Sequence, residues 1–276
     1  MTNIDTDFSG SIPEIYDSHL VPILFEGYAN DLADRVARTD PTAVLEVAAG
    51  SGAVTRALAP RLNDRCRYVV SDLNSAMLKC ARQHHKDKKL EWREANAMSL
   101  PFEDKSFDTV VCQFGVMFFP DRIKGFSEIL RVLRPGGQFI FNSWGPLDMN
   151  DFSHVAVETL IKLYPEDPPL FLARTPFGYA EASQIQADLT AAGFEVVRIE
   201  SVEMQSHAAT ADDFAFGQTH GSPLRLEIEA RGEPPLAHVR AAIQDALVAR
   251  FGCGEITGRM IALVTEAIAP RRPSKS

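Results

Sequence analysis

The sequence predicts an α/β fold in which a mostly parallel sheet carries helices on both faces. Two observations support this: a glycine turn after a buried apolar run within residues 44–55, and a regular alternation of strand and helix patterns beyond it. Further strands are expected at residues 68–72, 90–94, 107–114 and 138–142. Helical patterns lie between them at residues 54–62, 75–84 and 121–133. Such alternation is typical of parallel strands that are joined by crossover helices.

The first strand and its turn indicate a site for a nucleoside. The apolar run holds Glu46 and leads into Gly50 and Gly52, and a helical pattern begins directly afterwards. Glycine lets the backbone bend sharply and approach a ligand where a Cβ would clash. A dinucleotide fingerprint has a third glycine three residues after the second, and here that position is Thr55. The turn therefore fits a ligand that brings an adenosine without a pyrophosphate.

Polar residues stand where the later strands end. Asp72 closes the second strand, Asn96 follows the third, and Gln113 lies at the end of the fourth. The carboxyl ends of parallel strands meet at one edge of the sheet, where ligands bind, and a carboxylate there can accept hydrogen bonds from both hydroxyls of a ribose. The alternative for Asp72 is that it only caps the helix that starts near Ser75.

Five segments, taken in order, resemble the class I S-adenosylmethionine-dependent methyltransferases. They are VLEVAAGSG, SDLNSAML, the region around Asn96 and Ala97, FDTVVCQFGVMFFPD and RVLRPGG. The resemblance is greatest to the group that includes the ubiquinone and menaquinone methyltransferases. It implies a Rossmann-like seven-stranded sheet, mostly parallel with an antiparallel last strand, and S-adenosyl-L-methionine as the cofactor.

The resemblance also implies which residues bind the cofactor. They are Tyr16, Glu46, Ala48, Gly50, Gly52, Asp72, Leu73, Met77, Asn96, Ala97, Gln113 and Phe114. The backbone at Ala48 and Gly50, with Glu46 behind it, is expected to hold the methionine end of the cofactor, and Asp72 is expected to hold the ribose. The adenine is expected to pack against Leu73 and Met77.

The same resemblance implies which residues contact the edge of the adenine ring and which lie between the cofactor and the acceptor. Asn96 and the backbone of Ala97 are expected to form hydrogen bonds with the edge of the adenine ring. Many relatives have Asp where this chain has Asn96. An amide oxygen can still accept a hydrogen bond from the adenine amino group, so binding is expected to survive this difference. Gln113 and Phe114 are expected between cofactor and acceptor. Tyr16 precedes an N-terminal helix that closes over the cofactor in relatives, although a tyrosine there can also simply pack.

The second half extends the core and adds an insert. A helix is expected at residues 181–192, a sixth strand at 194–204 and a seventh strand at 261–268. A parallel sixth strand ends at the cofactor edge, so the connection to an antiparallel seventh strand must start there. That connection carries helical patterns at residues 211–218 and 236–251.

The chain accordingly divides into three parts. Residues 1–40 form an N-terminal helical cap, and residues 41–205 and 261–276 form the methyltransferase core, which includes the loop region 150–180. Residues 206–260 form a helical insert that serves as a substrate lid, with Phe214 and Phe216 as acceptor contacts. The alternative is that this insert is a dimerisation arm, which would make the protein a homodimer.

Composition excludes several classes of protein. A chain of 276 residues with 45% hydrophobic residues can bury a full core, and its net charge of −9 provides no attraction to nucleic acid. No apolar run is long enough to span a bilayer, and the polar, acidic start lacks a secretion signal. Cys66, Cys80, Cys112 and Cys253 show no metal-ligand spacing and are typical of reduced thiols in a cytoplasmic protein. We therefore predict no metal site and no integral membrane association.

Methyl transfer from the sulfonium group of S-adenosylmethionine requires few catalytic groups from the protein. The methyl donor is already activated, so the enzyme must align a nucleophile with the methyl group and exclude water. A base is needed only when the nucleophile carries a proton. His154, His207 and His220 are the histidines on the expected roof, but none is assigned as catalytic.

These observations favour a methyltransferase that acts on a small, hydrophobic or aromatic acceptor, such as a phenol, a quinone precursor or a secondary metabolite. Two alternatives stay open. One is an NAD(P)-binding Rossmann oxidoreductase, which Thr55 and the RPGG-opened fifth strand disfavour. The other is a regulatory or scaffold protein that binds the cofactor without catalysis.

Overall fold

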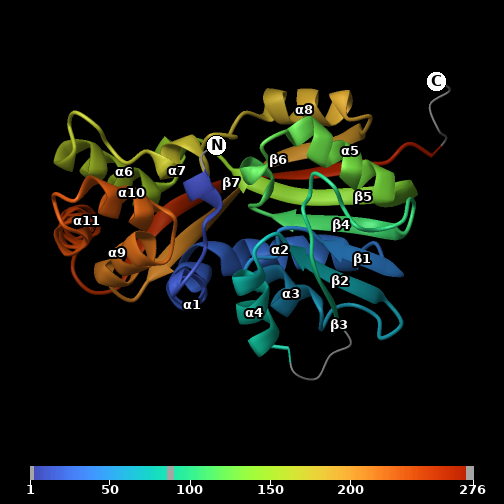
Figure 1. Cartoon of the computed structure of the whole chain (residues 1–276), viewed down its shortest axis with the longest axis horizontal. Helices are drawn as coiled ribbons and strands as arrows, with labels where there is room; N and C mark the ends of the chain where they lie inside the picture. Colours follow the sequence, from blue (N-terminus) through green and yellow to red (C-terminus); the bar gives the residue numbers. More distant parts are fainter. Residues whose placement is uncertain (1–2, 86–89, 272–276) are drawn as a thin grey trace.

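The computed structural model describes residues 3–85 and 90–271 and shows a three-layer α/β fold (Figure 1). Within these residues the central sheet has seven strands in the order β3-β2-β1-β4-β5-β7-β6. The strands are β1 Ala43–Glu46, β2 Arg67–Asp72, β3 Leu90–Glu94, β4 Phe107–Gln113, β5 Leu133–Trp144, β6 Glu195–Ala208 and β7 Ile256–Ile268. Strands β1 to β5 are parallel, and β7 pairs antiparallel with both β5 and β6. The predicted fold class is therefore confirmed.

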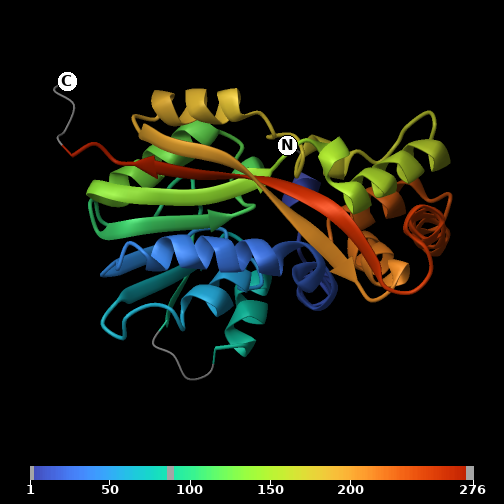
Figure 2. The same ribbon diagram turned by 180° about the vertical axis from the view of Figure 1, so that it is seen from behind.

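Helices cover both faces of the sheet and gather at one of its ends (Figures 1 and 2). The longer ones are α2 Glu26–Ala37, α4 Ser75–Gln83, α5 Arg122–Val132, α6 Asp151–Leu163, α8 Ala182–Ala191, α9 Ala211–His220, α10 Leu224–Arg231 and α11 Leu236–Phe251. The shorter helical segments are η1 Asn3–Thr6, α1 Ile12–Ile15, α3 Ala53–Leu58, η3 Val116–Phe118, η4 Leu147–Met149 and α7 Phe171–Arg174. A π-helical stretch, η2 Tyr16–Phe25, leads directly into α2.

Strand alternation divides the core between the two faces. Tyr68 and Val70 of β2 pack in one cluster with α2, α3 and α4, whereas Val69 between them belongs to the cluster on the opposite face. That second cluster includes Phe126 of α5 and Ile185 of α8. Successive side chains of a strand point to opposite faces, so a run of consecutive apolar residues is what a strand covered on both sides requires.

Strands β6 and β7 continue beyond the rest of the sheet. Pairing of β5 with β7 stops at Trp144 and Ala262, while β6 and β7 stay paired as far as Ala208 and Ile256. This two-stranded ribbon reaches into the group formed by α6, α7 and α9 to α11 (Figure 2). Since β6 and β5 are both antiparallel to β7, β6 runs parallel to β5 and ends at the edge where β1 to β5 also end. The inferred starting point of the insert is thus confirmed.

Several predicted boundaries were wrong by a few residues. The sixth and seventh strands extend to Ala208 and from Ile256, so the connection between them is shorter than residues 206–260. The sequence pattern also missed α10, whose buried face consists of only Leu224 and Ile228. Strand β5 begins at Leu133, so the RPGG segment lies within the bounds of the strand, and the φ of +78° at Gly136 marks a bend there.

The division into cap, core and lid remains a prediction. Residues 1–2, 86–89 and 272–276 of the predicted parts lie outside the described residues. No helix among the described residues is long and apolar enough to cross a membrane.

Candidate functional site

The turn after β1 combines three residues in left-handed backbone conformations. Ala48, Gly50 and Gly52 have φ values of +54°, +57° and +87°. A Cβ at Gly50 would point into open space, whereas a Cβ at Gly52 would lie 3.0 Å from the Cβ of Ala81 on α4. Gly52 therefore serves the packing of α3 on α4, and Ala48 carries backbone strain of the kind that is concentrated at functional sites.

Asp72, at the end of β2, is hydrogen-bonded to that turn. Its Oδ2 accepts from the backbone N–H of Gly50 at 2.8 Å, and its Oδ1 accepts from the backbone N–H of Asn74 at 2.7 Å. Burial raises the pKa of this carboxyl, while the two backbone donors favour its charged form. A carboxylate has about four acceptor positions, so roughly two remain for a ligand. The side chain lines a cavity at the strand ends.

Glu46 lies behind the turn, not in the cavity. It is 1% exposed, and its Oε2 accepts from the Thr55 hydroxyl at 2.7 Å and from the hydroxyl of Tyr68. Burial raises the pKa of the Glu46 carboxyl to about 7, against the stabilising effect of both hydroxyl donors. Thr55, which occupies the place of the third glycine, thus joins α3 to the end of β1.

The residues predicted around the adenine line one wall of the cavity. Leu73 is 57% exposed at its rim, and Met77 of α4 is buried. The Oδ1 of Asn96 accepts from the backbone N–H of Met98 at 2.9 Å. An amide oxygen has two lone pairs, so one acceptor position of Asn96 remains. Ala97 lies beside it in the same wall.

A second strained corner faces the first at the end of β4. Phe114 has a φ of +46°, and its backbone N–H donates to Asn142 Oδ1 at 2.9 Å. A Cβ at Gly115 would lie 2.5 Å from the Cβ of Ala48, so the two corners are in direct contact and only glycine fits there. Gln113 donates from Nε2 to the carbonyl of Phe25 at 3.4 Å, and its buried Oε1 has no hydrogen-bond partner among the described residues.

Aromatic rings form a second part of the lining. Phe114 stacks on Trp144 with ring centroids 3.9 Å apart, and Tyr16 stacks on Phe25 at 5.1 Å. Burial, followed by the nearby charge of Asp17, raises the pKa of the Tyr16 hydroxyl far above its usual value, so it stays protonated at neutral pH. Tyr16 is the first residue of η2 and lines the cavity.

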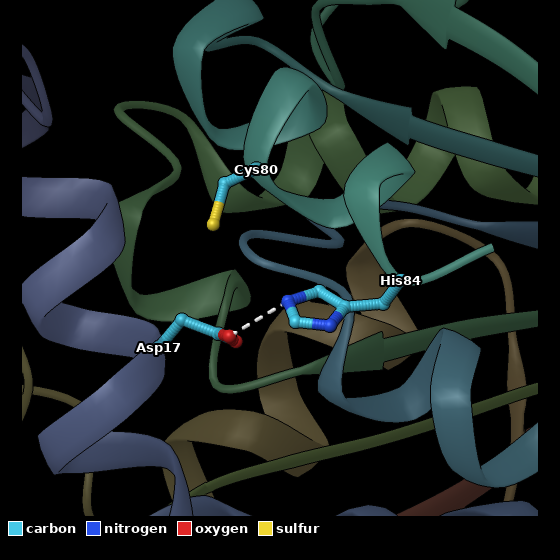
Figure 3. A group of neighbouring side chains, drawn as sticks. All are labelled: Asp17, Cys80 and His84. Carbon is cyan, nitrogen blue, oxygen red and sulfur yellow. Dashed lines mark ion pairs between the residues drawn. The ribbon is translucent and has the colours of Figure 1, made fainter. Parts of the chain in front are cut away.

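Next to Tyr16 the structure brings together three side chains that the sequence analysis did not connect. Asp17, Cys80 and His84 have their ligand atoms within 4.8 Å of one another, and Figure 3 shows Asp17 facing the His84 ring. His84 Nε2 lies 2.9 Å from Asp17 Oδ2, and Arg56 donates to Asp17 Oδ1 at 2.8 Å. The spacing of Cys80 and His84, four residues apart in the helix predicted at residues 75–84, was the available signal.

We interpret this cluster as an ion-pair network and not as a metal site. Both carboxylate oxygens of Asp17 already have partners, and the adjacent guanidinium of Arg56 would repel a cation. The network fixes η2 to α3 and α4, beside the cavity. The absence of a metal site stays a prediction.

The cavity has a volume of about 310 Å³ and lies at the carboxyl ends of the parallel strands. All of the predicted cofactor-binding residues line it except Glu46 and Gly52. Further lining residues come from the N-terminus, from η3 and β5, and from α6, α7 and α9 with the turns that follow them: Phe8, Phe118, Trp144, Ser153, Phe171, Phe177, Gln218, Ser222 and Pro223. The sequence pattern placed the Phe171 region and the 206–260 insert near the strand ends but assigned no contact to Ser153 or Gln218. Among the described lining residues, Asp72 alone carries a formal charge.

Other expected contacts lie elsewhere. His154, His207 and His220 are absent from the described lining. The hypothesis that Phe214 and Phe216 touch the acceptor is not supported. Phe214 is fully buried against Phe152, and Phe216 stacks on His220. Neither ring is part of the described lining.

Comparisons with known proteins agree with this geometry. Residues 45–141 match the family model of a methyltransferase domain. The chain is 33% identical over 125 residues to a ubiquinone/menaquinone biosynthesis C-methyltransferase, UbiE, of Enterobacter sp. (strain 638). The match covers 44% of this chain and 47% of that relative, so the chain spans about half the length of the relative.

Solved structures share the fold at low sequence identity. Phosphoethanolamine N-methyltransferase 2 of Haemonchus contortus, in complex with phosphomonomethylethanolamine and S-adenosylhomocysteine, superposes with a TM-score of 0.60 at 18% identity, over 98% of this chain and 61% of that chain. The [4+2]-cyclase SpnF superposes with a TM-score of 0.54 at 21% identity, over 87% of this chain and 81% of that chain. A shared fold therefore does not determine the reaction.

The family match, the ordered motifs and the seven-stranded sheet agree, and the predicted family and cofactor class are confirmed. Residues 45–141 of the chain thus match a methyltransferase domain, and the fold of the chain is that of the class I S-adenosylmethionine-dependent methyltransferases.

Proposed function

We propose that the protein transfers a methyl group from S-adenosylmethionine to a small, uncharged acceptor that is apolar or aromatic. The observation that carries the proposal is a single cavity with two unlike walls. One wall consists of the strained glycine turn, Asp72 and the Asn96 segment, and the other consists of aromatic rings. Such a cavity fits a polar nucleoside and an apolar partner side by side.

The first wall supports the cofactor half of the proposal. Asp72 would hold the ribose hydroxyls with its remaining lone pairs, while its bonds to Gly50 and Asn74 keep the turn in place. Gly50 would allow the methionine end to approach the backbone closely, since a Cβ there would protrude into open space. Leu73 and Met77 would sandwich the adenine. S-adenosylmethionine supplies the electrophilic methyl group.

The second wall supports the acceptor half. Phe25, Phe114, Trp144 and Phe177 provide apolar surface that excludes water and orients a flat molecule. In the transfer, the bond from the methyl carbon to sulfur breaks and its electron pair stays on sulfur, while the acceptor atom bonds the methyl carbon from the opposite side. The acceptor releases its proton to solvent. Histidine, lysine and glutamate are missing from the described lining, so an uncharged acceptor that needs no protein base, and loses its proton to water as the methyl group is transferred, suits the site.

The experiment that tests the proposal is methyl transfer from S-adenosylmethionine labelled in the methyl group. The panel contains neutral phenols and hydroquinones, together with benzoates and phosphate esters as charged comparisons. We expect labelled product from members of the neutral set and none from the charged set. Cofactor binding without transfer to any neutral acceptor would contradict an enzymatic role and favour a protein that only binds the cofactor.

A further inference from the structure

Two buried polar side chains of the acceptor wall make no hydrogen bond. Gln218 of α9 is 3% exposed and Ser153 of α6 is 5% exposed, and both line the cavity. Among the described residues neither the Gln218 amide nor the Ser153 hydroxyl has a hydrogen-bonding partner. Their neighbour Ser222 differs, because its hydroxyl donates to the Gln218 carbonyl at 2.7 Å and accepts from the backbone N–H of Leu224.

Unpartnered polar groups in such a place call for an explanation. Neither group is among the polar atoms that are fully closed off from solvent without a partner, so both are reached from the cavity, where only water or a bound molecule can pair with them. Apolar side chains would fill the same positions without needing such a partner, as Phe171 and Phe177 do elsewhere in this lining. A bound molecule that displaces the water has to supply these hydrogen bonds itself.

The backbone that carries Gln218 is held firmly. A Cβ at Gly217 would lie 2.9 Å from the Cβ of His19, and one at Gly221 would lie 2.9 Å from the backbone N of Tyr16. Helix α9 therefore packs directly on η2, and it starts with a capping box between Thr210 and Asp213. A side chain on so constrained a helix is suited to select among ligands.

The charge of the cavity lining indicates that the ligand is uncharged. No cationic side chain lies in the described lining, and Asp72 would repel an anion. A carboxylate or phosphate would lose its hydration without gaining a counter-charge. An amide and a hydroxyl can each donate and accept, which suits an uncharged hydroxyl or carbonyl group.

We propose that Gln218 and Ser153 form a recognition subsite for uncharged hydroxyl or carbonyl groups of a ring-shaped acceptor. The inference rests on the proposed function and adds the residues that select the acceptor. Gln218 and Ser153 bind polar atoms of the acceptor, while the rings around Trp144 hold its apolar part.

The test measures binding of three bicyclic probes to the protein loaded with S-adenosylhomocysteine. The probes are 2-naphthol, 2-naphthoate and 2-methylnaphthalene, and equilibrium dialysis gives each dissociation constant. We expect 2-naphthol to bind at least about tenfold more tightly than 2-naphthoate. Gln218→Met, which keeps the side-chain volume, should weaken 2-naphthol about fivefold and leave 2-methylnaphthalene within about twofold. Ser153→Ala is the second variant, with the same expected pattern.

Gln186→Met on α8, where the glutamine is exposed, is the matched control and should change none of the three constants. Equal weakening of 2-naphthol and 2-methylnaphthalene, unchanged 2-naphthol binding in both site variants, or failure of all probes to bind would overturn the inference. If S-adenosylhomocysteine itself does not bind the wild-type protein, the proposed function fails and the inference fails with it. Retained S-adenosylhomocysteine binding without probe selectivity removes the inference alone.

Discussion

Glu46 and Asp72 end neighbouring strands, but they occupy different environments. The Asp72 carboxylate borders the cavity and accepts from two backbone N–H groups, whereas Glu46 is enclosed and accepts from two hydroxyls. The sequence predicted both as important, because a carboxyl within or after an apolar run needs a partner. It did not predict that Asp72 also holds the Gly50 turn, since that bond depends on the three-dimensional meeting of β1 and β2.

Replacing Asp72 tests its assignment to the ribose. In Asp72→Ala, charge-assisted hydrogen bonds to the ribose hydroxyls are lost, so calorimetry should show affinity for S-adenosylhomocysteine at least about tenfold lower. Asp64→Ala, at an exposed acidic position, serves as the control and should bind normally. Wild-type affinity in a folded Asp72→Ala protein would refute the assignment.

Glu46 should make stability depend on pH. Its pKa is about 7 in the folded protein against 4.5 in the unfolded chain, so the folded state alone holds the proton between these values. Stability contributed by this group is complete below about pH 4.5 and falls as pH rises towards 7, by up to about 3 kcal/mol. Glu46→Gln keeps an acceptor oxygen for Thr55 and Tyr68 but cannot ionise.

Urea unfolding from pH 5 to pH 8 measures this effect. The free energy of unfolding of Glu46→Gln relative to wild type should increase from pH 5 to about pH 7 and level off above it. A difference between the two proteins that is the same at every pH would show that Glu46 does not titrate in this window.

Secondary structure was predicted best where a helix or strand coincides with a single regular pattern of apolar residues. Helix α11 and strand β3 have the predicted bounds, and the core strands differ only at their ends. Helix α10 was missed because Leu224 and Ile228 give too short an apolar stripe, and the ends of β6 and β7 were missed because the ribbon pairs with itself beyond the sheet. Helix α10 and the ends of β6 and β7 depend on contacts with residues far away in the sequence, and a local sequence pattern does not record such contacts.

The close contact of α9 with η2 can be tested at Gly217. Alanine favours a helix interior by up to about 1 kcal/mol over glycine, but a Cβ here would lie 2.9 Å from both His19 Cβ and Leu20 Cδ2. We expect Gly217→Ala to lower the free energy of unfolding by about 1–3 kcal/mol in urea titrations.

Gly27→Ala is the matched control for that substitution. Gly27 lies in α2, and its nearest neighbour is the Sδ of the flexible Met204 side chain. This variant should be neutral or slightly stabilised. Equal stability of Gly217→Ala and wild type would show that α9 and η2 are less closely packed than the structure indicates.

At the scale of the whole molecule, segments far apart in the sequence build one cavity. The cofactor side was predictable because its residues sit in ordered motifs at the strand ends. The acceptor side was not, because Phe8, Ser153 and Gln218 come from the N-terminus, α6 and α9 and share no motif. The insert contributes Gln218 to the lining, whereas Phe214, one turn earlier on the same face of α9, packs against Phe152, and Phe216 stacks on His220.

Metal independence is a prediction for the complete protein. Sulfonium transfer needs no Lewis acid, and the Asp17 carboxylate already pairs with Arg56 and contacts His84. Methyl transfer should be unchanged after dialysis against EDTA. Activity that is lost on dialysis and regained with Zn²⁺ or Mg²⁺ would show that a metal site exists.

The central claim is that this cavity binds S-adenosylmethionine, and calorimetry tests it most directly. Titrations of the purified protein with S-adenosylhomocysteine and with NADH are compared under the same conditions. The structure leads us to expect saturable binding of S-adenosylhomocysteine with one site per chain, and no saturable heat with NADH. Saturable binding of NADH together with no binding of S-adenosylhomocysteine would contradict the account.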